Sequence, residues 1–201
     1  MTDVDDVARA IRDGKLAVLP TDTVYGLVCT ASHREAAADL YRLKGRSAIQ
    51  PTAVVFGSVA VLPDYLPELD DRVRAVVAAL LPGPYTLVVA NPARRFAWLT
   101  EGRPESIGLR VPVLAGAAAA IVERVGAVVA TSANLSGGHD PRTLAEVPPE
   151  IMAGVAAAVD GGELPGTPST VIDVTGAAPL IIRAGAGDPA GALARVEALG
   201  A

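Results

Sequence analysis

The stretch LAVLPTDTVYGLVCT, residues 16–30, decides the fold. Two apolar runs, Leu16–Leu19 and Val24–Thr30, flank a short polar segment that begins at Pro20. Short aliphatic and β-branched runs bounded by turn residues are typical of buried strands. A connection of only a few residues brings two such strands together as antiparallel neighbours. The stretch therefore predicts a pair of antiparallel strands near the start of the chain.

The rest of the chain alternates between helical and extended patterns. Apolar residues at helical spacing predict helices over 3–13, 34–43, 69–81, 115–125 and 189–199. Short apolar runs predict strands over 52–56, 85–90, 107–111, 127–131, 155–159, 169–174 and 180–183, the last two as a second antiparallel pair. Residues 91–104 and 135–150 are interpreted as loops. Because the order is not a strict βα repeat, the pattern favours an α/β (α+β) fold, a mixed parallel and antiparallel sheet flanked by helices.

Composition restricts the class of protein. The chain has 201 residues without an internal repeat or a Pro/Ser-rich linker, which predicts a single domain over 1–201. Apolar residues make up 51% and charged residues 19%, so a disordered chain is excluded. The net charge of −5 argues against a dedicated nucleic-acid-coating protein, which would be basic. Any contact with RNA would have to be local.

Cysteine and histidine are scarce. One cysteine, Cys29, cannot form an internal disulfide, and with His33 and His139 it cannot build a Cys/His zinc cluster. The same scarcity argues against Ser-His-Asp and Cys-His enzymes. The acidic N-terminus lacks the features of a signal peptide, and the longest apolar run, near 114–122, is too short to cross a bilayer. We therefore expect a cytoplasmic protein without a membrane segment.

Polar segments beside the apolar strands are where a sheet presents functional groups. The first, residues 20–23, holds two threonine hydroxyls and the Asp22 carboxylate, and a turn in which Asp22 bonds its own backbone is the alternative. The second carries Arg42, Lys44 and Arg46 at the end of a predicted helix. These cations either stabilise the helix C-terminus or form an anion clamp, with Lys44 and Arg46 on the same side of an extended chain.

Two further segments place hydroxyl and amide groups beside strands. TSANLSG, residues 131–137, follows an apolar strand, where its small polar side chains suit either a phosphate or a helix N-cap. GTPSTVID, residues 166–173, opens another strand with hydroxyl groups. Arg110 and Arg183 stand at strand ends among apolar neighbours. Either a bound anion or a structural ion pair would offset the cost of burying these two charges.

Familiar nucleotide-binding motifs are missing from the sequence. It contains no GxxxxGK[ST] phosphate loop, and GAGDPAG at residues 185–191 misses the GxGxxG pattern by one residue. From the residues alone, the chain is an α/β domain that binds an anionic ligand through Ser, Thr, Lys and Arg side chains. The residues alone leave the reaction open.

Seven segments, taken in order, resemble the YrdC-like family, the L-threonylcarbamoyladenylate synthases. No single segment is diagnostic, but their shared order from residue 19 to residue 185 is specific. The segments are LPTDTVYGL (19–27), LKGR (43–46), LPGPYTLVV (81–89), SIGLRVP (106–112), TSANLSG (131–137), TPSTVID (167–173) and IIRAG (181–185).

The resemblance implies a twisted mixed sheet with a deep basic cavity, in the short single-domain form of the family. It implies an ATP-dependent nucleotidyltransferase that joins L-threonine, bicarbonate or CO2, and ATP to give threonylcarbamoyl-AMP and pyrophosphate. This is the first step of N6-threonylcarbamoyladenosine formation in tRNA. Mg²⁺ would arrive on the ATP, without a metal site built by the protein. A downstream threonylcarbamoyl-transfer complex would use the product, so contact with tRNA would be indirect.

The family's motifs also imply roles for individual residues. The K-x-R motif implies that Lys44 and Arg46 are catalytic and hold the ATP phosphates or the carbamate. The implied nucleotide site consists of Arg42, Lys44, Arg46, Ser106, Ser132, Asn134 and Arg183. The implied threonine site consists of Thr21, Thr23, Arg110 and Ser169, with Arg110 pairing with the threonine carboxylate.

The sequence departs from the family pattern in two places. Ser47 follows the K-x-R motif where the family usually has proline, and the segment after Pro51 lacks a histidine that some members carry. No general base is therefore assigned there. Closure over ATP would fall to the loops at 91–104 or 135–150.

Two other functions are compatible with a domain of this kind. The alternative is a non-catalytic module of the same fold that binds tRNA or double-stranded RNA. The acidic balance and the lack of aromatic residues beside the cations argue against it. A carbamoyl-transferring hydrogenase-maturation enzyme is a third possibility, but such chains carry acylphosphatase-like and zinc-finger portions that this sequence does not supply.

Overall fold

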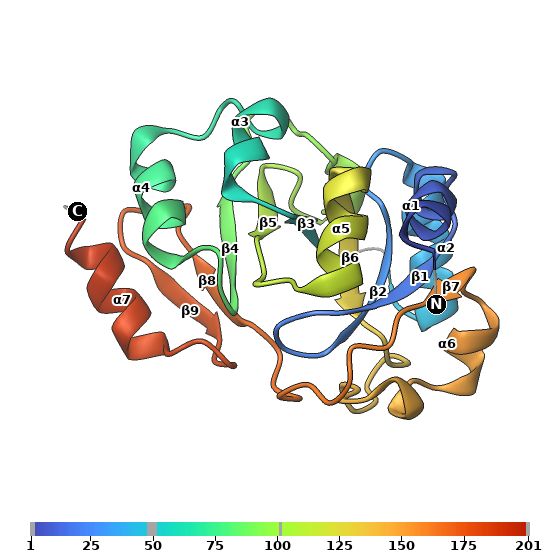
Figure 1. Ribbon diagram of the computed structural model, residues 1–201. Coiled ribbons are helices and arrows are strands. Elements are labelled where there is room, and N and C mark those ends of the chain that lie inside the picture. Colours follow the sequence, from blue (N-terminus) through green and yellow to red (C-terminus); the bar gives the residue numbers. More distant parts are fainter. Residues whose placement is uncertain (1–2, 48–51, 101, 200–201) are drawn as a thin grey trace.

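The computed structural model describes residues 3–47, 52–100 and 102–199. The nine strands of this part of the chain belong to one sheet, in the order β7-β1-β2-β6-β3-β5-β4-β8-β9, and helices lie along it (Figure 1). The strands are β1 (Ala17–Pro20), β2 (Tyr25–Thr30), β3 (Ala53–Phe56), β4 (Tyr85–Ala90), β5 (Ser106–Arg110), β6 (Ala127–Ser132), β7 (Ala157–Ala158), β8 (Thr170–Asp173) and β9 (Leu180–Arg183). The helices are α1 (Val4–Arg12), α2 (Arg34–Lys44), α3 (Leu62–Tyr65), α4 (Asp71–Leu80), α5 (Gly116–Val125), α6 (Pro149–Ala153) and α7 (Pro189–Glu197).

The two strand pairs predicted from the sequence are confirmed. In the first pair, β1 and β2 are antiparallel, with Ala17 opposite Val28 and Pro20 opposite Tyr25. The second pair, β8 and β9, is also antiparallel. Elsewhere β3 pairs with β5, and β4 with β8, in parallel. The expected mixed sheet flanked by helices is therefore confirmed as well.

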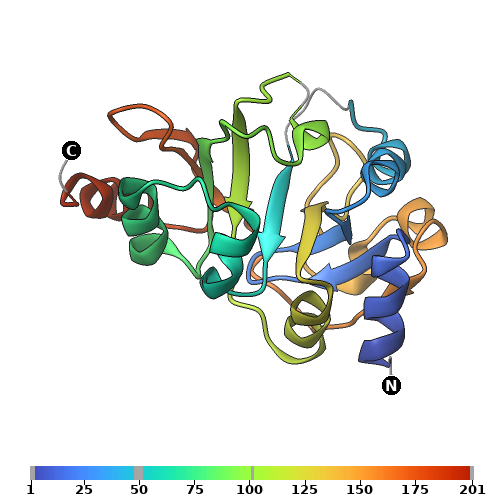
Figure 2. The same ribbon diagram turned by 90° about the horizontal axis from the view of Figure 1, so that it is seen from above.

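The two faces of the sheet carry side chains of different size. Because side chains alternate along a strand, each strand contributes to both faces. One face packs large apolar residues such as Leu27, Phe56 and Leu87 against α2, α4 and α7. The opposite face packs against α1 and α5 at one end only, through residues such as Val28 and Val128. Figure 2 shows α1 and α5 on one side of the central strands and α2 on the other.

The second face is hollow where α1 and α5 do not cover it. There the strands present small residues to the interior, namely Gly26 of β2, Ala53 of β3, Gly108 of β5 and Ala130 of β6. A Cβ atom on Gly108 would lie 3.1 Å from both Cα and Cβ of Ala53, so β3 and β5 approach closely at this point. Small side chains on this floor leave space for a cavity above the sheet.

Three segments differ from the elements predicted for them. Residues 59–65 form a short 3-10 turn and α3, where no element is predicted. Helix α6 begins in the last two residues of the predicted loop 135–150 and runs to residue 153, because Pro149 at the first helical position already has a helical φ angle. The predicted strand 155–159 is reduced to β7, whose two residues pair with β1 at the edge of the sheet. None of the described helices is long and apolar enough to cross a membrane.

The hydroxyl of Tyr25 ties β2 to the segment that follows β7. Its oxygen accepts the Gly161 N–H at 2.9 Å and lies 3.0 Å from Asp160 Oδ1 and 2.8 Å from the Gly162 carbonyl oxygen. The Gly166 N–H then donates to the Thr23 carbonyl at 2.9 Å. These bonds hold residues 160–166 against the turn between β1 and β2.

We predict that Tyr25→Phe lowers the free energy of unfolding by about 1–3 kcal/mol, since it leaves the Gly161 N–H without an acceptor. Urea denaturation measures this change. Tyr85→Phe is the matched control, because the Tyr85 hydroxyl makes only a 3.5 Å contact with the Asp188 carbonyl. Equal effects of the two substitutions would contradict the prediction.

Candidate functional site

A cavity of about 490 Å³ opens above the floor of small residues. Its walls come from the strand ends and loops of β2, β6, β5, β4, β8 and β9, so segments far apart in the sequence meet there. Ten of the eleven predicted site residues lie at this cavity. Seven line it directly, namely Thr21, Arg46, Ser106, Arg110, Ser132, Ser169 and Arg183. The other three, Thr23, Lys44 and Asn134, contact residues of its wall. The sequence motifs therefore converge on one place.

Positive charge dominates the cavity lining. Among the described residues of the lining, the ionisable ones are Arg46, Arg103, Arg110, Arg183 and a single carboxylate, Asp140. Burial lowers the pKa of Arg46 and of Arg110, and the charge of Arg183 lowers both further. These guanidinium groups are close enough to repel one another and are partly removed from water. An anionic ligand would relieve both costs.

Arg110 extends from the end of β5 toward the turn between β1 and β2. Its Nη2 donates to Asp22 Oδ1 at 2.5 Å and to Thr23 Oγ1 at 2.7 Å. The side chains of Arg110 and Asp22 are each only 11% exposed. The buried Nε of Arg110 has no hydrogen-bond partner in the part of the chain that the structure describes. Nη2 of Arg110 is thus fixed by protein oxygens, and its Nε–H remains as a donor for a ligand.

Thr21, rather than Asp22, closes the turn between β1 and β2. The Thr21 hydroxyl donates to the Val24 carbonyl at 2.7 Å and accepts the Thr23 and Val24 N–H groups at 3.2 Å. The Asp22 carboxylate reaches Arg110 and the Val113 N–H instead of its own backbone. The segment is therefore a turn, as one interpretation has it, but its carboxylate serves the cavity wall.

Lys44 is the last residue of α2 and is almost fully buried. Its Nζ donates to the Ser132 carbonyl at 2.6 Å, the Asn134 carbonyl at 2.9 Å and Asn134 Oδ1 at 2.5 Å. An ammonium group has three protons, and these acceptors use all of them. Asn134 is held further by the Ser132 hydroxyl, which donates to its Oδ1 at 2.7 Å. In this structure Lys44 fastens the 132–134 segment and does not itself line the cavity.

Arg46 reaches the same strand end from the other side of Gly45. Its Nη1 donates to the Thr131 hydroxyl at 3.1 Å, and its side chain lines the cavity. The extended chain that was expected to align Lys44 and Arg46 is wrong: both side chains reach the end of β6, but only that of Arg46 lines the cavity. Lys44 is helical, and Gly45 ends the helix in the left-handed conformation at φ 66°. Glycine adopts that conformation at no steric cost.

Arg183, the last residue of β9, and Ser169, just before β8, form another part of the wall. Arg183 donates from Nε and Nη2 to the Ser169 carbonyl at 3.1 and 2.8 Å, and from Nη2 to the Ser169 hydroxyl at 3.3 Å. The Ser169 hydroxyl also lies 2.8 Å from that of Thr86 on β4. These oxygens are neutral, so they orient the Arg183 guanidinium without balancing its charge.

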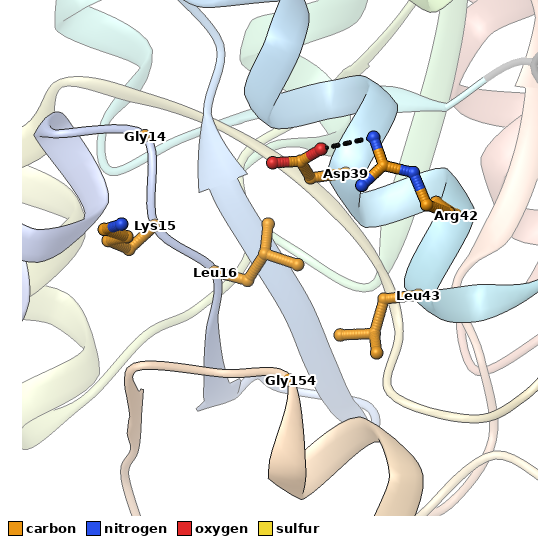
Figure 3. A pocket seen from close by; sticks show the side chains of 7 residues that line it. All are labelled: Gly14, Lys15, Leu16, Asp39, Arg42, Leu43 and Gly154. Carbon is orange, nitrogen blue, oxygen red and sulfur yellow. Dashed lines mark hydrogen bonds and ion pairs between the residues drawn. The ribbon is translucent and has the colours of Figure 1, made fainter.

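Arg42 lies outside this cavity, which corrects its place in the nucleotide site. Its Nη2 pairs with Asp39 at 2.7 Å, one turn earlier on α2, and its side chain is 76% exposed. Figure 3 shows Arg42 in a separate, open pocket of about 550 Å³ with Lys15, Leu43 and Gly154. Residues 42 and 44 on a helix differ by roughly 200° in direction. When Lys44 points inward, Arg42 therefore points to solvent.

Several lining residues are missing from the sequence-based site. Asp140 and Arg103 come from the two predicted loops, where no local pattern distinguishes them. Thr52 and Thr100 are buried in the lining, and their hydroxyls have no partner among the described residues. The sequence could have revealed Thr86, because it is a polar residue on the inner face of a buried strand.

The chain is similar to known proteins in sequence and in fold. A family model for the Sua5, YciO and YrdC proteins, described as "Telomere recombination", matches residues 9–185. The chain belongs to the Sua5/YciO/YrdC family. A relative from Mycobacterium tuberculosis (strain CDC 1551 / Oshkosh) named "Putative threonylcarbamoyl-AMP synthase" is 33% identical over 177 residues, which cover 88% of this chain and 81% of the relative.

Two solved structures of the family have the same fold. The H234A/Y235A form of Pyrococcus abyssi Sua5 matches with a TM-score of 0.86 and 30% identity, covering 94% of this chain and 58% of that one. P. abyssi Sua5 complexed with L-threonine matches with a TM-score of 0.83 and 31% identity, covering 90% and 54%. This chain therefore spans little more than half the length of the P. abyssi Sua5 chains.

The buried lysine of this Sua5/YciO/YrdC chain can be titrated directly. Burial is the main cause that lowers the pKa of the Lys44 ammonium from 10.5 to about 8, with a smaller effect from the Arg46 charge. Between these two pH values the unfolded chain binds more protons than the folded one. The contribution of Lys44 to stability therefore rises with pH across that window.

We predict that the ¹³Cε resonance of Lys44 titrates with a midpoint near pH 8. The chain contains only two lysines, Lys15 and Lys44, so NMR of lysine-labelled protein gives two resonances, and Lys15→Arg leaves that of Lys44 alone. A midpoint above about pH 10, the range of an ordinary lysine, would contradict the prediction.

Proposed function

We propose that this chain is a threonylcarbamoyl-AMP synthase, which joins L-threonine, bicarbonate or CO2, and ATP to give threonylcarbamoyl-AMP and pyrophosphate. Its family and its named relatives support this activity. The observation that carries the proposal is the meeting of Arg46, Arg110 and Arg183 in one cavity, where the described lining residues include a single carboxylate, Asp140. The substrates bring what that lining lacks, because threonine and bicarbonate each carry a negative charge and ATP carries several.

The cavity offers two kinds of anion site. Around Arg110, the threonine hydroxyls and an already paired guanidinium suit the carboxylate of an amino acid. Ser169, which the family's motifs assign to the threonine site, is bonded to Arg183 and would reach threonine from there. On the nucleotide side, Arg46 donates to the Thr131 hydroxyl and Arg183 to the Ser169 carbonyl, and the guanidinium groups of both suit the phosphates of ATP. Ser106, Ser132 and Asn134 add hydroxyl and amide groups to the nucleotide side.

The reaction needs positioning more than reactive side chains. The threonine amine adds to CO2 and loses a proton, which forms a carbamate. A carbamate oxygen then attacks the α-phosphorus of ATP, the bond from that phosphorus to the bridging oxygen breaks, and pyrophosphate leaves. Holding the reactants in line and balancing the phosphate charge supply most of the catalysis in phosphoryl transfer. Arg46 contacts the reacting phosphates in this scheme, while Lys44 holds the Ser132–Asn134 segment against them.

Mg²⁺ belongs to the substrate in this proposal. It would arrive on the ATP phosphates, where oxygen ligands and water complete its coordination. Within residues 3–47, 52–100 and 102–199, no group of three His, Cys, Asp or Glu side chains is placed to hold a metal ion. The product would pass to a downstream threonylcarbamoyl-transfer complex that modifies tRNA, so contact with tRNA would be indirect. These substrates and this use of the product fit a cytoplasmic enzyme.

The test is pyrophosphate release with Mg-ATP and bicarbonate in the presence of single amino acids. We expect release that depends on L-threonine. Arg46→Ala should lower the rate about 100-fold or more, since it removes a charged contact to the reacting phosphates. Arg42→Ala is the matched control, because its side chain leaves α2 toward solvent, and it should stay within about twofold.

Two results would contradict the proposal. One is pyrophosphate release that is independent of threonine. The other is salt-dependent RNA binding without any ATP turnover, which would favour the non-catalytic RNA-binding module. A third result concerns the site: equal losses of activity in Arg46→Ala and Arg42→Ala would show that the reaction does not depend on the cavity.

A further inference from the structure

The Asp22 carboxylate joins two walls of the cavity. It lies in the turn between β1 and β2, and its two oxygens bind different partners. Oδ1 accepts from Arg110 Nη2 at 2.5 Å, and Oδ2 accepts the Val113 N–H at 3.1 Å. Val113 lies three residues after Arg110, in the segment that leaves β5. A single side chain thus holds both the guanidinium and the backbone that follows it.

Arg110 needs such a partner because its surroundings disfavour its charge. Burial lowers the pKa of Arg110, the charge of Arg183 lowers it further, and Asp22 is the group that opposes both effects. Without the carboxylate, a buried guanidinium would keep only the Thr23 hydroxyl among the bonds of Nη2. It would then be free to turn toward any anion bound near Arg183.

We infer that Asp22 is a positioning residue that reserves Arg110 for the carboxylate of the amino-acid substrate. This inference rests on the proposed function. Asp22 fixes Nη2, and the buried Nε remains without a partner among the described residues. Because Asp22 already balances the charge, Arg110 offers oriented donors rather than a strong excess charge. Such a site suits a singly charged carboxylate, whereas Arg183, held by neutral oxygens, suits a polyphosphate.

The substitution Asp22→Asn tests this role with little change of shape. An asparagine has one oxygen and one NH2 group in place of two oxygens. In either orientation its NH2 group faces a donor, either Arg110 Nη2 or the Val113 N–H. The substitution therefore removes the charge and breaks one of the two bonds while the volume is kept.

The experiment measures initial rates of pyrophosphate release while L-threonine and ATP are varied in turn. We expect Asp22→Asn to raise KM for threonine about tenfold or more and to leave KM for ATP within about twofold. Glu68→Gln is the matched control, since it breaks the exposed ion pair with Arg95 at 2.6 Å, and should change neither constant. A general loss of folded protein would lower kcat in proportion and leave both KM values unchanged.

Other outcomes are equally decisive. An unchanged KM for threonine in Asp22→Asn, or equal increases in both KM values, would overturn the inference while the proposed function stands. Wild-type protein without threonine-dependent release would overturn the proposed function itself. If circular dichroism shows that Asp22→Asn is unfolded, Asp22→Glu takes its place, because it keeps the charge and displaces it by one methylene group. The inference then requires KM for threonine to change more than KM for ATP.

Discussion

The gathering of arginine side chains around one cavity is the constraint on which the rest of this structure depends. Arg46, Arg110 and Arg183 reach the cavity from different strand ends or loops, and the charge of Arg183 lowers the pKa of both Arg46 and Arg110. Like charges that are held close together and partly removed from water are costly, so a fold that gathers them is suited to a negative ligand. The sheet and the hydrogen bonds around the cavity hold these three side chains in place.

The support comes from the sheet and from two buried charged residues. Small residues on the inner face make room above β2, β6, β3 and β5, while large apolar residues on the other face form the core. Asp22 accepts a hydrogen bond from Arg110, and Lys44 donates to three oxygens of the segment at the end of β6. These two residues do not line the cavity, yet they fix the groups that do. The charged ligand site is therefore built on rigid strand ends rather than on mobile side chains.

Local sequence patterns predicted most of the strands, because a short apolar run bounded by turn residues depends only on near neighbours. The antiparallel pairs β1–β2 and β8–β9 follow from such patterns. The common cavity of the polar segments was implied by the family resemblance and not by any local pattern. Other features could not be predicted from local patterns. The partner of Asp22 is Arg110, 88 residues away, where a bond to its own backbone was one of the two interpretations. Thr52 and Thr100 showed no local signal. Arg42 was placed at the nucleotide by the family resemblance, but it points away from the cavity and pairs with Asp39 on its own helix.

The central claim is that one cavity joins an amino acid, a one-carbon unit and a nucleotide. The most direct measurement follows the carbon of ¹³C-labelled bicarbonate in a reaction with L-threonine and Mg-ATP, by mass spectrometry of the nucleotide products. The account predicts a single product that contains the labelled carbon, threonine and AMP. Conversion of ATP to AMP and pyrophosphate with no label in any nucleotide would contradict it.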